Sequence, residues 1–260
     1  MHNYKLTLAY DGTRYAGWQR QNHPASLKIQ TIQDEVDAAL CKVFKKRISV
    51  IGCGRTDSGV HAIGFVANFK TAEFIPEPSF KIALNCALPS DISVLDIKEV
   101  PNDFHARFDA KRKIYRYLIS NNQVKTIFSN SRAWWIRYRL NVNLMRRESR
   151  VLLGKHNFKS FQAADRLKRC SVTTIRRIDI KKFKGCALYP FLKGENLVAI
   201  DIEGTGFLRN MARNIVGTLI EVGRGRIKKG GLLEILKRRD RRHVGSCAPA
   251  HGLYLLKVKY

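Results

Sequence analysis

Gly54-Arg55-Thr56-Asp57-Ser58-Gly59-Val60-His61-Ala62 joins two stretches of strand-like sequence in a chain of 260 residues. Residues 47–53 and 63–69, on either side of it, are rich in the β-branched and aromatic side chains typical of strands. The stretch itself has a glycine on each side of Asp57, and Asp-Ser-Gly is common in tight turns. It therefore predicts a strand–turn–strand unit with a single carboxylate, that of Asp57, at the tip of the turn.

The first half of the chain alternates between strand and helix patterns around this turn. Strands are predicted at residues 4–10, 47–53, 63–69 and 92–100, and helices at residues 31–43 and 77–87. Thr31 is a favourable N-cap residue, and apolar side chains then recur at helical spacing from Ile32 to Val43. The order strand–helix–strand–strand–helix–strand is that of the split βαβ units in ferredoxin-like folds.

The second half repeats this plan. Strands are predicted at residues 113–119, 172–182, 197–203 and 253–258, and helices at residues 142–153 and 206–222. A long loop over residues 182–196 joins two of these strands. We therefore predict an α+β protein of two RRM/ferredoxin-like halves, residues 1–106 and 107–260, whose antiparallel sheets flank a central basic active-site cleft.

The charge of the chain indicates a polyanionic partner. Lysine and arginine number 48 against 21 acidic residues, which gives a net charge of +27 and a pI near 10.2. Self-repulsion of this size destabilises the folded state unless an opposite charge is bound. Nucleic acid is the first candidate and an anionic membrane surface the second. The sequence contains neither an apolar run of spanning length nor a secretory leader, so we expect a cytoplasmic protein that does not enter the membrane.

The basic residues gather in three clusters, of which the second also carries aromatic side chains. The clusters are Arg107, Lys111, Arg112, Lys113 and Arg116; Arg132, Arg137, Arg139, Arg146, Arg147 and Arg150 with Trp134, Trp135 and Tyr138; and Lys237, Arg238, Arg239, Arg241 and Arg242. One such cluster is typical of a solvated face, but three with few acids nearby favour a phosphate-binding surface. Its affinity should fall steeply with salt, and charge alone does not separate RNA from DNA.

The sequence offers no sign of a metal or a cofactor. Its six cysteines are scattered, none of them in a C-x-x-C pair, and no cysteine–histidine group has zinc-ligand spacing. We expect reduced, mostly structural thiols, no metal and no cofactor.

Several motifs resemble those of the TruA family of tRNA pseudouridine synthases. In chain order the matching blocks are Tyr10-Asp11-Gly12-Thr13, Gly17-Trp18-Gln19-Arg20-Gln21, the stretch around Asp57, Phe104-His105-Ala106-Arg107-Phe108, Tyr115-Arg116-Tyr117, Gly206 to Gly217, and Gly252-Leu253-Tyr254-Leu255. Because these blocks keep the family's order from one end of the chain to the other, the resemblance covers nearly the whole sequence.

The resemblance implies a catalytic role for three residues. It makes Asp57 the nucleophile, Arg213 the cation that pairs with it, and Tyr115 the side chain that stacks on the target base and helps to remove its C5 proton. Pattern alone favours the ordinary interpretation of both residues: Arg213 as an arginine on the polar face of a helix, and Tyr115 as a core aromatic in a strand.

Other residues are expected to hold the substrate. Arg55, two residues before Asp57, should point to the same side and bind a phosphate or the flipped nucleotide. Leu253 is expected to pack against the active-site pocket, while Arg20 and Arg107, in two of the matching blocks, complete the predicted substrate-binding set. His61 is interpreted as a structural histidine, because the family assigns its position no chemistry.

The implied reaction needs a nucleophile and no redox partner. Uridine becomes pseudouridine when the N1–C1′ bond breaks and the uracil rejoins the sugar through C5, in the anticodon stem-loop of tRNA at positions 38–40. A carboxylate can attack either C6 of the base or C1′ of the sugar, and the sequence leaves both open. The base must leave its stack to be reached. The resemblance also implies a homodimer.

A non-catalytic RNA-binding protein or RNA chaperone on the same scaffold is the alternative. It explains the charge equally well but gives no role to Asp57. A DNA-binding regulator is disfavoured, because the sequence lacks a helix-turn-helix or zinc pattern.

Overall fold

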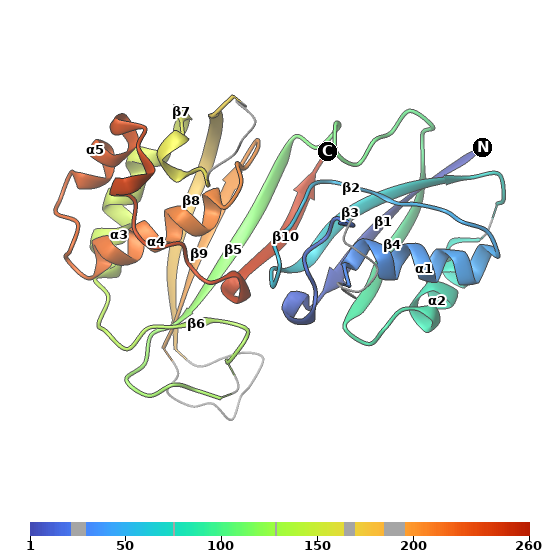
Figure 1. Ribbon diagram of the computed structural model, residues 1–260, viewed down its shortest axis with the longest axis horizontal. Helices are drawn as coiled ribbons and strands as arrows, with labels where there is room; N and C mark the ends of the chain where they lie inside the picture. Colours follow the sequence, from blue (N-terminus) through green and yellow to red (C-terminus); the bar gives the residue numbers. More distant parts are fainter. Residues whose placement is uncertain (22–29, 75, 128, 164–169, 185–195) are drawn as a thin grey trace. The chain divides into compact units, whose positions relative to one another are not determined.

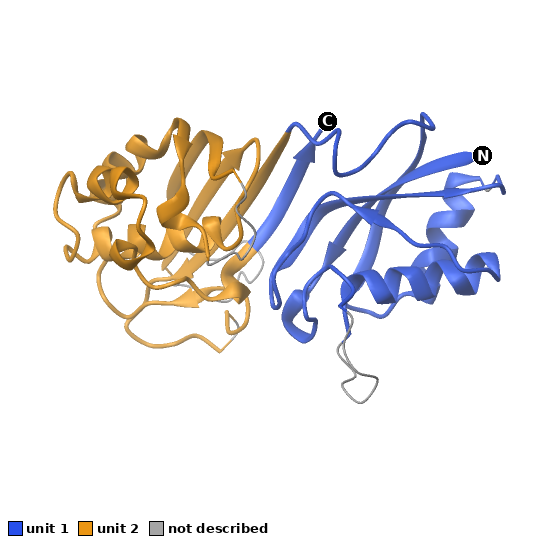
Figure 2. Ribbon diagram, turned by 45° about the horizontal axis from the view of Figure 1, so that its top comes forward, with its two compact units in different colours: residues 1–111, 254–260 blue, residues 112–253 orange. Residues whose placement is uncertain are grey.

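The computed structural model describes residues 1–21, 30–74, 76–127, 129–163, 170–184 and 196–260. Two compact units form, one from Met1–Lys111 with Tyr254–Tyr260 and one from Arg112–Leu253 (Figure 2). Both combine helices with a mostly antiparallel sheet, which confirms the α+β prediction. The sequence places a boundary between residues 106 and 107 and assigns the last strand to the second half. In the structure Tyr254–Tyr260 group with the first unit, and two of these residues pair with a strand of that unit.

Unit 1 has the predicted order of elements. It contains β1 (His2–Tyr10), α1 (Ile32–Phe44), β2 (Ile51–Gly52), β3 (His61–Thr71), α2 (Glu77–Ala87), β4 (Ile92–Val100) and β10 (Leu253–Lys259) (Figure 1). β1 lies between β3 and β4 and is antiparallel to both. β10 runs parallel to β3, and the short β2 pairs with β3 in the antiparallel sense.

The predicted strand at residues 47–53 is wrong for most of its length, since only Ile51–Gly52 pair. The reason lies in α1. The Asp37 carboxylate accepts hydrogen bonds from the Val50 N–H (2.9 Å) and the Ser49 hydroxyl (3.0 Å). This backbone is therefore bound to a side chain of the helix and not to a neighbouring strand. Burial raises the pKa of Asp37.

Aromatic side chains attach both helices to one face of the unit 1 sheet. Alternate residues of β1 are buried, as the two-residue period of a strand requires. The Phe80 ring of α2 packs edge-on against Tyr4 of β1, Phe69 of β3 and Phe44 at the end of α1, with ring centroids 5.3–5.8 Å apart. Aromatic pairs in this geometry each contribute about 0.5–1.5 kcal/mol beyond area burial. Thr31 caps α1 as predicted, since its side chain accepts from the Asp34 N–H.

Unit 2 is built from antiparallel strands covered by helices. It contains β5 (Arg112–Ser120), β6 (Trp134–Trp135), α3 (Val142–Ser149), β7 (Gly154–Asn157), β8 (Val172–Lys184), β9 (Asn196–Gly204), α4 (Met211–Gly223) and α5 (Gly231–Arg238). The strand order is β5-β9-β8-β7, all antiparallel neighbours, with β6 added parallel to β5. The predicted pairing of residues 172–182 with 197–203 is confirmed. Residues 185–195 of the predicted long loop lie outside the described residues.

Two predicted helices are shorter than expected, and three elements were not predicted. α3 ends at Ser149 and continues as a 3-10 turn over Arg150–Leu152. α4 begins at Met211 and not at Gly206, because Asn210 has a left-handed backbone (φ 58°) that a continuous α-helix excludes. The elements that the sequence did not predict are β6, β7 and α5.

Candidate active site

Asp57 opens a tight turn in unit 1. The Val60 N–H donates to the Asp57 carbonyl oxygen (3.2 Å), and Gly59 has φ +76°, the left-handed position that glycine takes without strain. Ser58 and Gly59 are therefore the tip, and the prediction that Asp57 stands there is corrected to the first position of the turn. Thr56 and Val60 are buried on either side, while Asp57 itself is half-buried. The buried neighbours fix the backbone on both sides of Asp57.

The segment between β1 and α1 holds this turn from one side. The Gly59 N–H (3.3 Å) and the Ser58 hydroxyl (3.1 Å) both donate to the Tyr15 carbonyl oxygen. The Trp18 N–H donates to the Thr56 carbonyl oxygen at 3.3 Å. The turn is thus bound through its backbone to the segment that carries the Gly17-Trp18 motif.

Close approach explains one glycine of that motif. Gly17 has φ +92°, and a Cβ there would overlap the Thr56 carbonyl oxygen and press on the Asp57 backbone. Trp18, next in the chain, stacks on Phe65 of β3 with ring centroids 4.0 Å apart. The motif therefore brings the backbone of its segment against the Asp57 turn and anchors it in the core.

His61 is a buried structural histidine in this structure. Its Nδ1 accepts from the Gly12 N–H (3.1 Å), and its ring stacks on Tyr254 of β10 with centroids 4.7 Å apart. The ring therefore joins β3 both to the 3-10 turn Gly12–Arg14 and to the last strand, which agrees with the role predicted for it.

The three predicted arginines of unit 1 have different surroundings. Arg55 and Arg107 are exposed, and the Arg107 guanidinium lies 5.6 Å from the Phe108 ring centroid. Arg20 is instead paired with two carboxylates of α1, Asp34 (2.5 Å) and Asp37 (2.9 Å). A phosphate would have to compete with these two carboxylates for Arg20.

Tyr115 lies on β5 of unit 2, directly opposite Ile202 of β9. Its half-buried ring meets Phe207 edge-on, with centroids 4.8 Å apart at 73°. Next to it, Arg116 forms two hydrogen bonds of 2.7 Å with the Asp201 carboxylate across the strand pair. Tyr115 thus lies on a strand whose pairing with β9 is reinforced by a bidentate ion pair.

Arg213 is oriented by the segment that precedes β10. It is the one half-buried residue in the first turn of α4, and its Nε donates to the Ala248 carbonyl oxygen at 2.7 Å. The Ala248 N–H donates back to the Arg213 carbonyl oxygen at 3.2 Å. Leu253, a few residues on, is buried. The predicted catalytic set is therefore divided: Asp57 belongs to unit 1, and Tyr115, Arg213 and Leu253 belong to unit 2.

His251, near Arg213, makes stability depend on pH. Burial lowers the pKa of His251 from its usual 6.5, and the positive charges of Lys125 and Arg213 lower it further. The unfolded chain therefore binds a proton at His251 more readily than the folded protein does. The contribution of neutral His251 to folding stability is complete above about pH 6.5 and is lost as the pH falls below it. In urea unfolding at pH 7.5 and 5.5, we expect a smaller loss of stability for His251→Gln than for the unaltered protein. An equal loss in the two proteins would contradict this.

Sequence reasoning missed the neighbours that position these side chains. Phe207 stands inside a motif that the sequence singled out, but its contact with Tyr115 depends on tertiary structure. The contact of Ala248 with Arg213 depends on it as well. Within the described ranges, no three His, Cys, Asp or Glu side chains group as metal ligands would. The described part of the chain also has no helix long and apolar enough to cross a membrane. Among the described residues, Cys41, Cys53, Cys86, Cys170 and Cys247 form no disulfide, and Cys186 lies outside the described residues.

Comparison with known proteins identifies the family. The family model described as tRNA pseudouridine synthase matches residues 7–109 and 149–260. The chain is 40% identical over 260 residues to tRNA pseudouridine synthase A of Thermoanaerobacter sp. (strain X514), and 41% identical over 260 residues to that of Clostridium acetobutylicum, with both chains covered completely in each case. It is 41% identical to tRNA pseudouridine synthase A 2 of Clostridium tetani over 258 residues, or 99% of this chain and 98% of that one. With matches of this length and identity, the chain belongs to the TruA family of tRNA pseudouridine synthases, which are isomerases that act on tRNA.

Proposed function

We propose that the protein isomerises uridine to pseudouridine in the anticodon stem-loop of tRNA, at positions 38–40, with Asp57 as the nucleophile. The Asp57 turn is the observation that supports this most. Asp57 is half-buried between the buried Thr56 and Val60, and backbone hydrogen bonds hold the turn in place. A turn held in this way presents its carboxylate from a fixed backbone position, which favours a positioned nucleophile.

The proposed roles of the other residues follow from the chemistry. The N1–C1′ bond breaks, a C5–C1′ bond forms, C5 loses a proton and N1 gains one, so the reaction is balanced without a cofactor. Arg213 would keep the Asp57 carboxylate ionised by pairing with it. Tyr115 would stack on the flipped uracil and assist loss of the C5 proton. Arg55 and Arg107 would bind phosphates, with Leu253 against the base.

Tritium release tests this proposal. With unmodified tRNA labelled at C5 of uridine, formation of the C5–C1′ bond must expel the label into water. We expect release, and we expect it to disappear when the uridines at positions 38–40 are replaced by cytidines. Salt-sensitive tRNA binding without release would instead favour the RNA-binding alternative.

We also propose a cytoplasmic homodimer, on the basis of the family resemblance and the tRNA substrate. Light scattering of the purified protein would then give twice the mass of one chain, 29.8 kDa. A mass equal to one chain, alone and with tRNA, would contradict the dimer.

A further inference from the structure

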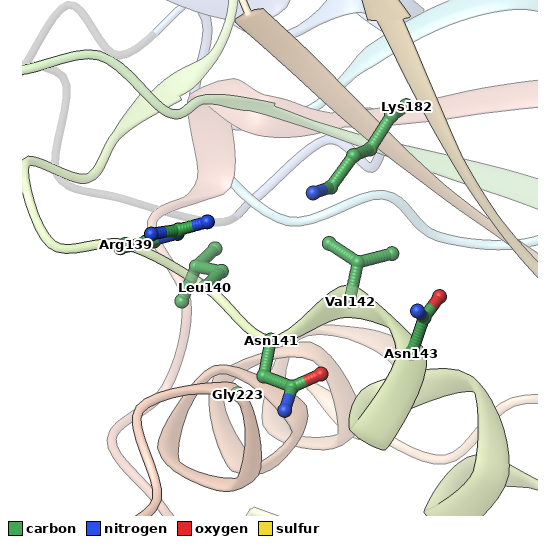
Figure 3. A pocket seen from close by; sticks show the side chains of 7 residues that line it. All are labelled: Arg139, Leu140, Asn141, Val142, Asn143, Lys182 and Gly223. Carbon is green, nitrogen blue, oxygen red and sulfur yellow. The ribbon is translucent and has the colours of Figure 1, made fainter.

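Unit 2 contains a pocket of about 480 Å³ where the start of α3, the end of β8 and the end of α4 come together (Figure 3). It is lined by Arg139, Leu140, Asn141, Val142, Asn143, Lys182 and Gly223. A pocket of several hundred Å³ is large enough for a nucleotide. None of these residues is in the set predicted for catalysis or for holding the target uridine.

Two cations line opposite sides of this pocket. In Figure 3 the Lys182 ammonium reaches in from β8, and the Arg139 guanidinium lies beside Leu140 at the left of the view. Both residues are exposed, and within the described ranges neither has a carboxylate partner. Because unpaired, exposed cations remain available, the pocket favours an anionic ligand.

The polar donors of the pocket fit a phosphate. The Asn143 Oδ1 accepts from Arg146 Nη1 (3.0 Å), so the NH₂ group of Asn143 remains to donate. Among the lining residues, Asn141 is the N-cap of α3 and Val142 and Asn143 begin the helix, whose dipole also favours negative charge. Asn143 and the two cations thus offer three donor side chains of the kind that bind phosphate oxygens.

An apolar floor and a neighbouring aromatic group complete the site. Leu140 and Val142 are buried beneath the cations. Tyr138, one residue before Arg139, is 50% exposed. The guanidiniums of Arg224 and Arg137 lie 4.3 Å and 5.4 Å from its ring centroid. Stacked arginine and tyrosine planes are the groups on which unpaired RNA bases stack.

We propose that this pocket binds a phosphate of tRNA and its nucleoside, at a nucleotide other than the target uridine. The proposal rests on the function proposed above, since it assumes tRNA as the substrate. An RNA chain is favoured over a free nucleotide because Arg137 and Tyr138, just before Arg139 in the chain, are exposed beside the pocket, while Arg224 is paired with Glu221 (3.1 Å). A strand of RNA would contact these groups as well, whereas a single nucleotide would not.

The test is the double variant Arg139→Gln/Lys182→Gln, measured by Kd for tRNA and by steady-state kinetics. We expect Kd and KM to rise about tenfold with kcat unchanged, and the salt dependence of log Kd to become less steep by about one unit. The matched control is Arg47→Gln/Lys81→Gln, which removes one arginine and one lysine, both exposed, from unit 1. We expect the control to change little. The charge-conserving variant Arg139→Lys/Lys182→Arg should retain most of the affinity.

Three results would overturn this proposal. The first is no change in Kd for the pocket variant, and the second is an equal change in the control, which would indicate net charge alone. In the third, the pocket variant loses affinity for uridine 5′-monophosphate but keeps its affinity for tRNA. The ligand of the pocket would then be a free nucleotide and not tRNA. The pocket proposal and the proposed function can fail separately, because Kd is measured without turnover. The proposed function fails if the unaltered protein releases no tritium.

Discussion

Asp57→Asn is expected to abolish tritium release from C5-labelled tRNA and to leave the Kd for tRNA unchanged. Asparagine has nearly the shape of aspartate, so the turn closed by the Val60 N–H should persist. Its amide is not a nucleophile, and loss of a covalent catalyst lowers kcat by on the order of 10⁴-fold or more. Single-turnover release and filter binding on the same preparation measure the two quantities.

A matched control separates chemistry from charge. Asp103→Asn makes the same substitution at an exposed carboxylate of unit 1 and should release tritium at the unaltered rate. If Asp57→Asn remained active, Asp57 would not be the nucleophile. If it lost tRNA binding together with turnover, its effect would be on the fold or on binding, and the catalytic role would lose its support.

Gly17→Ala is expected to reduce both stability and turnover strongly. The methyl group would overlap the Thr56 carbonyl oxygen and press on the Asp57 backbone, at a residue whose φ of +92° already disfavours alanine. Left-handed strain and overpacking together cost about 2–5 kcal/mol. A shift of the Asp57 turn by about 1 Å would lower kcat by on the order of 100-fold. Urea unfolding and tritium release measure the two effects.

Gly225→Ala is the control for backbone strain alone. Gly225 also has a left-handed backbone, with φ +77°, but a Cβ there meets nothing within 4 Å. We expect it to cost only the strain, about 1–2 kcal/mol, and to leave kcat unchanged. Equal loss of turnover in the two variants would show that contact with the Asp57 turn is not what makes Gly17 necessary.

Local patterns predicted most of the secondary structure. Hydrophobic spacing predicted the helices at residues 31–43 and 77–87 and the long strands, and Thr31 marked the start of the first helix. These signals come from residues within a few positions of one another in the chain. Prediction was wrong where a distant group decided the backbone. Residues 49–50 bind the Asp37 side chain in place of a strand.

The sequence by itself determined the order of strands and helices, the net charge of +27 that favours a polyanionic partner, and the motifs that resemble the TruA family. All of these depend on composition or on residues close together in the chain. Only the tertiary structure decided that Tyr15 and Trp18 hold the Asp57 turn, that Ala248 orients Arg213, and that Arg139 and Lys182 line one pocket. The physical reason is that these contacts join residues far apart in sequence, and no periodicity or propensity encodes which distant backbone and side-chain groups will pack together.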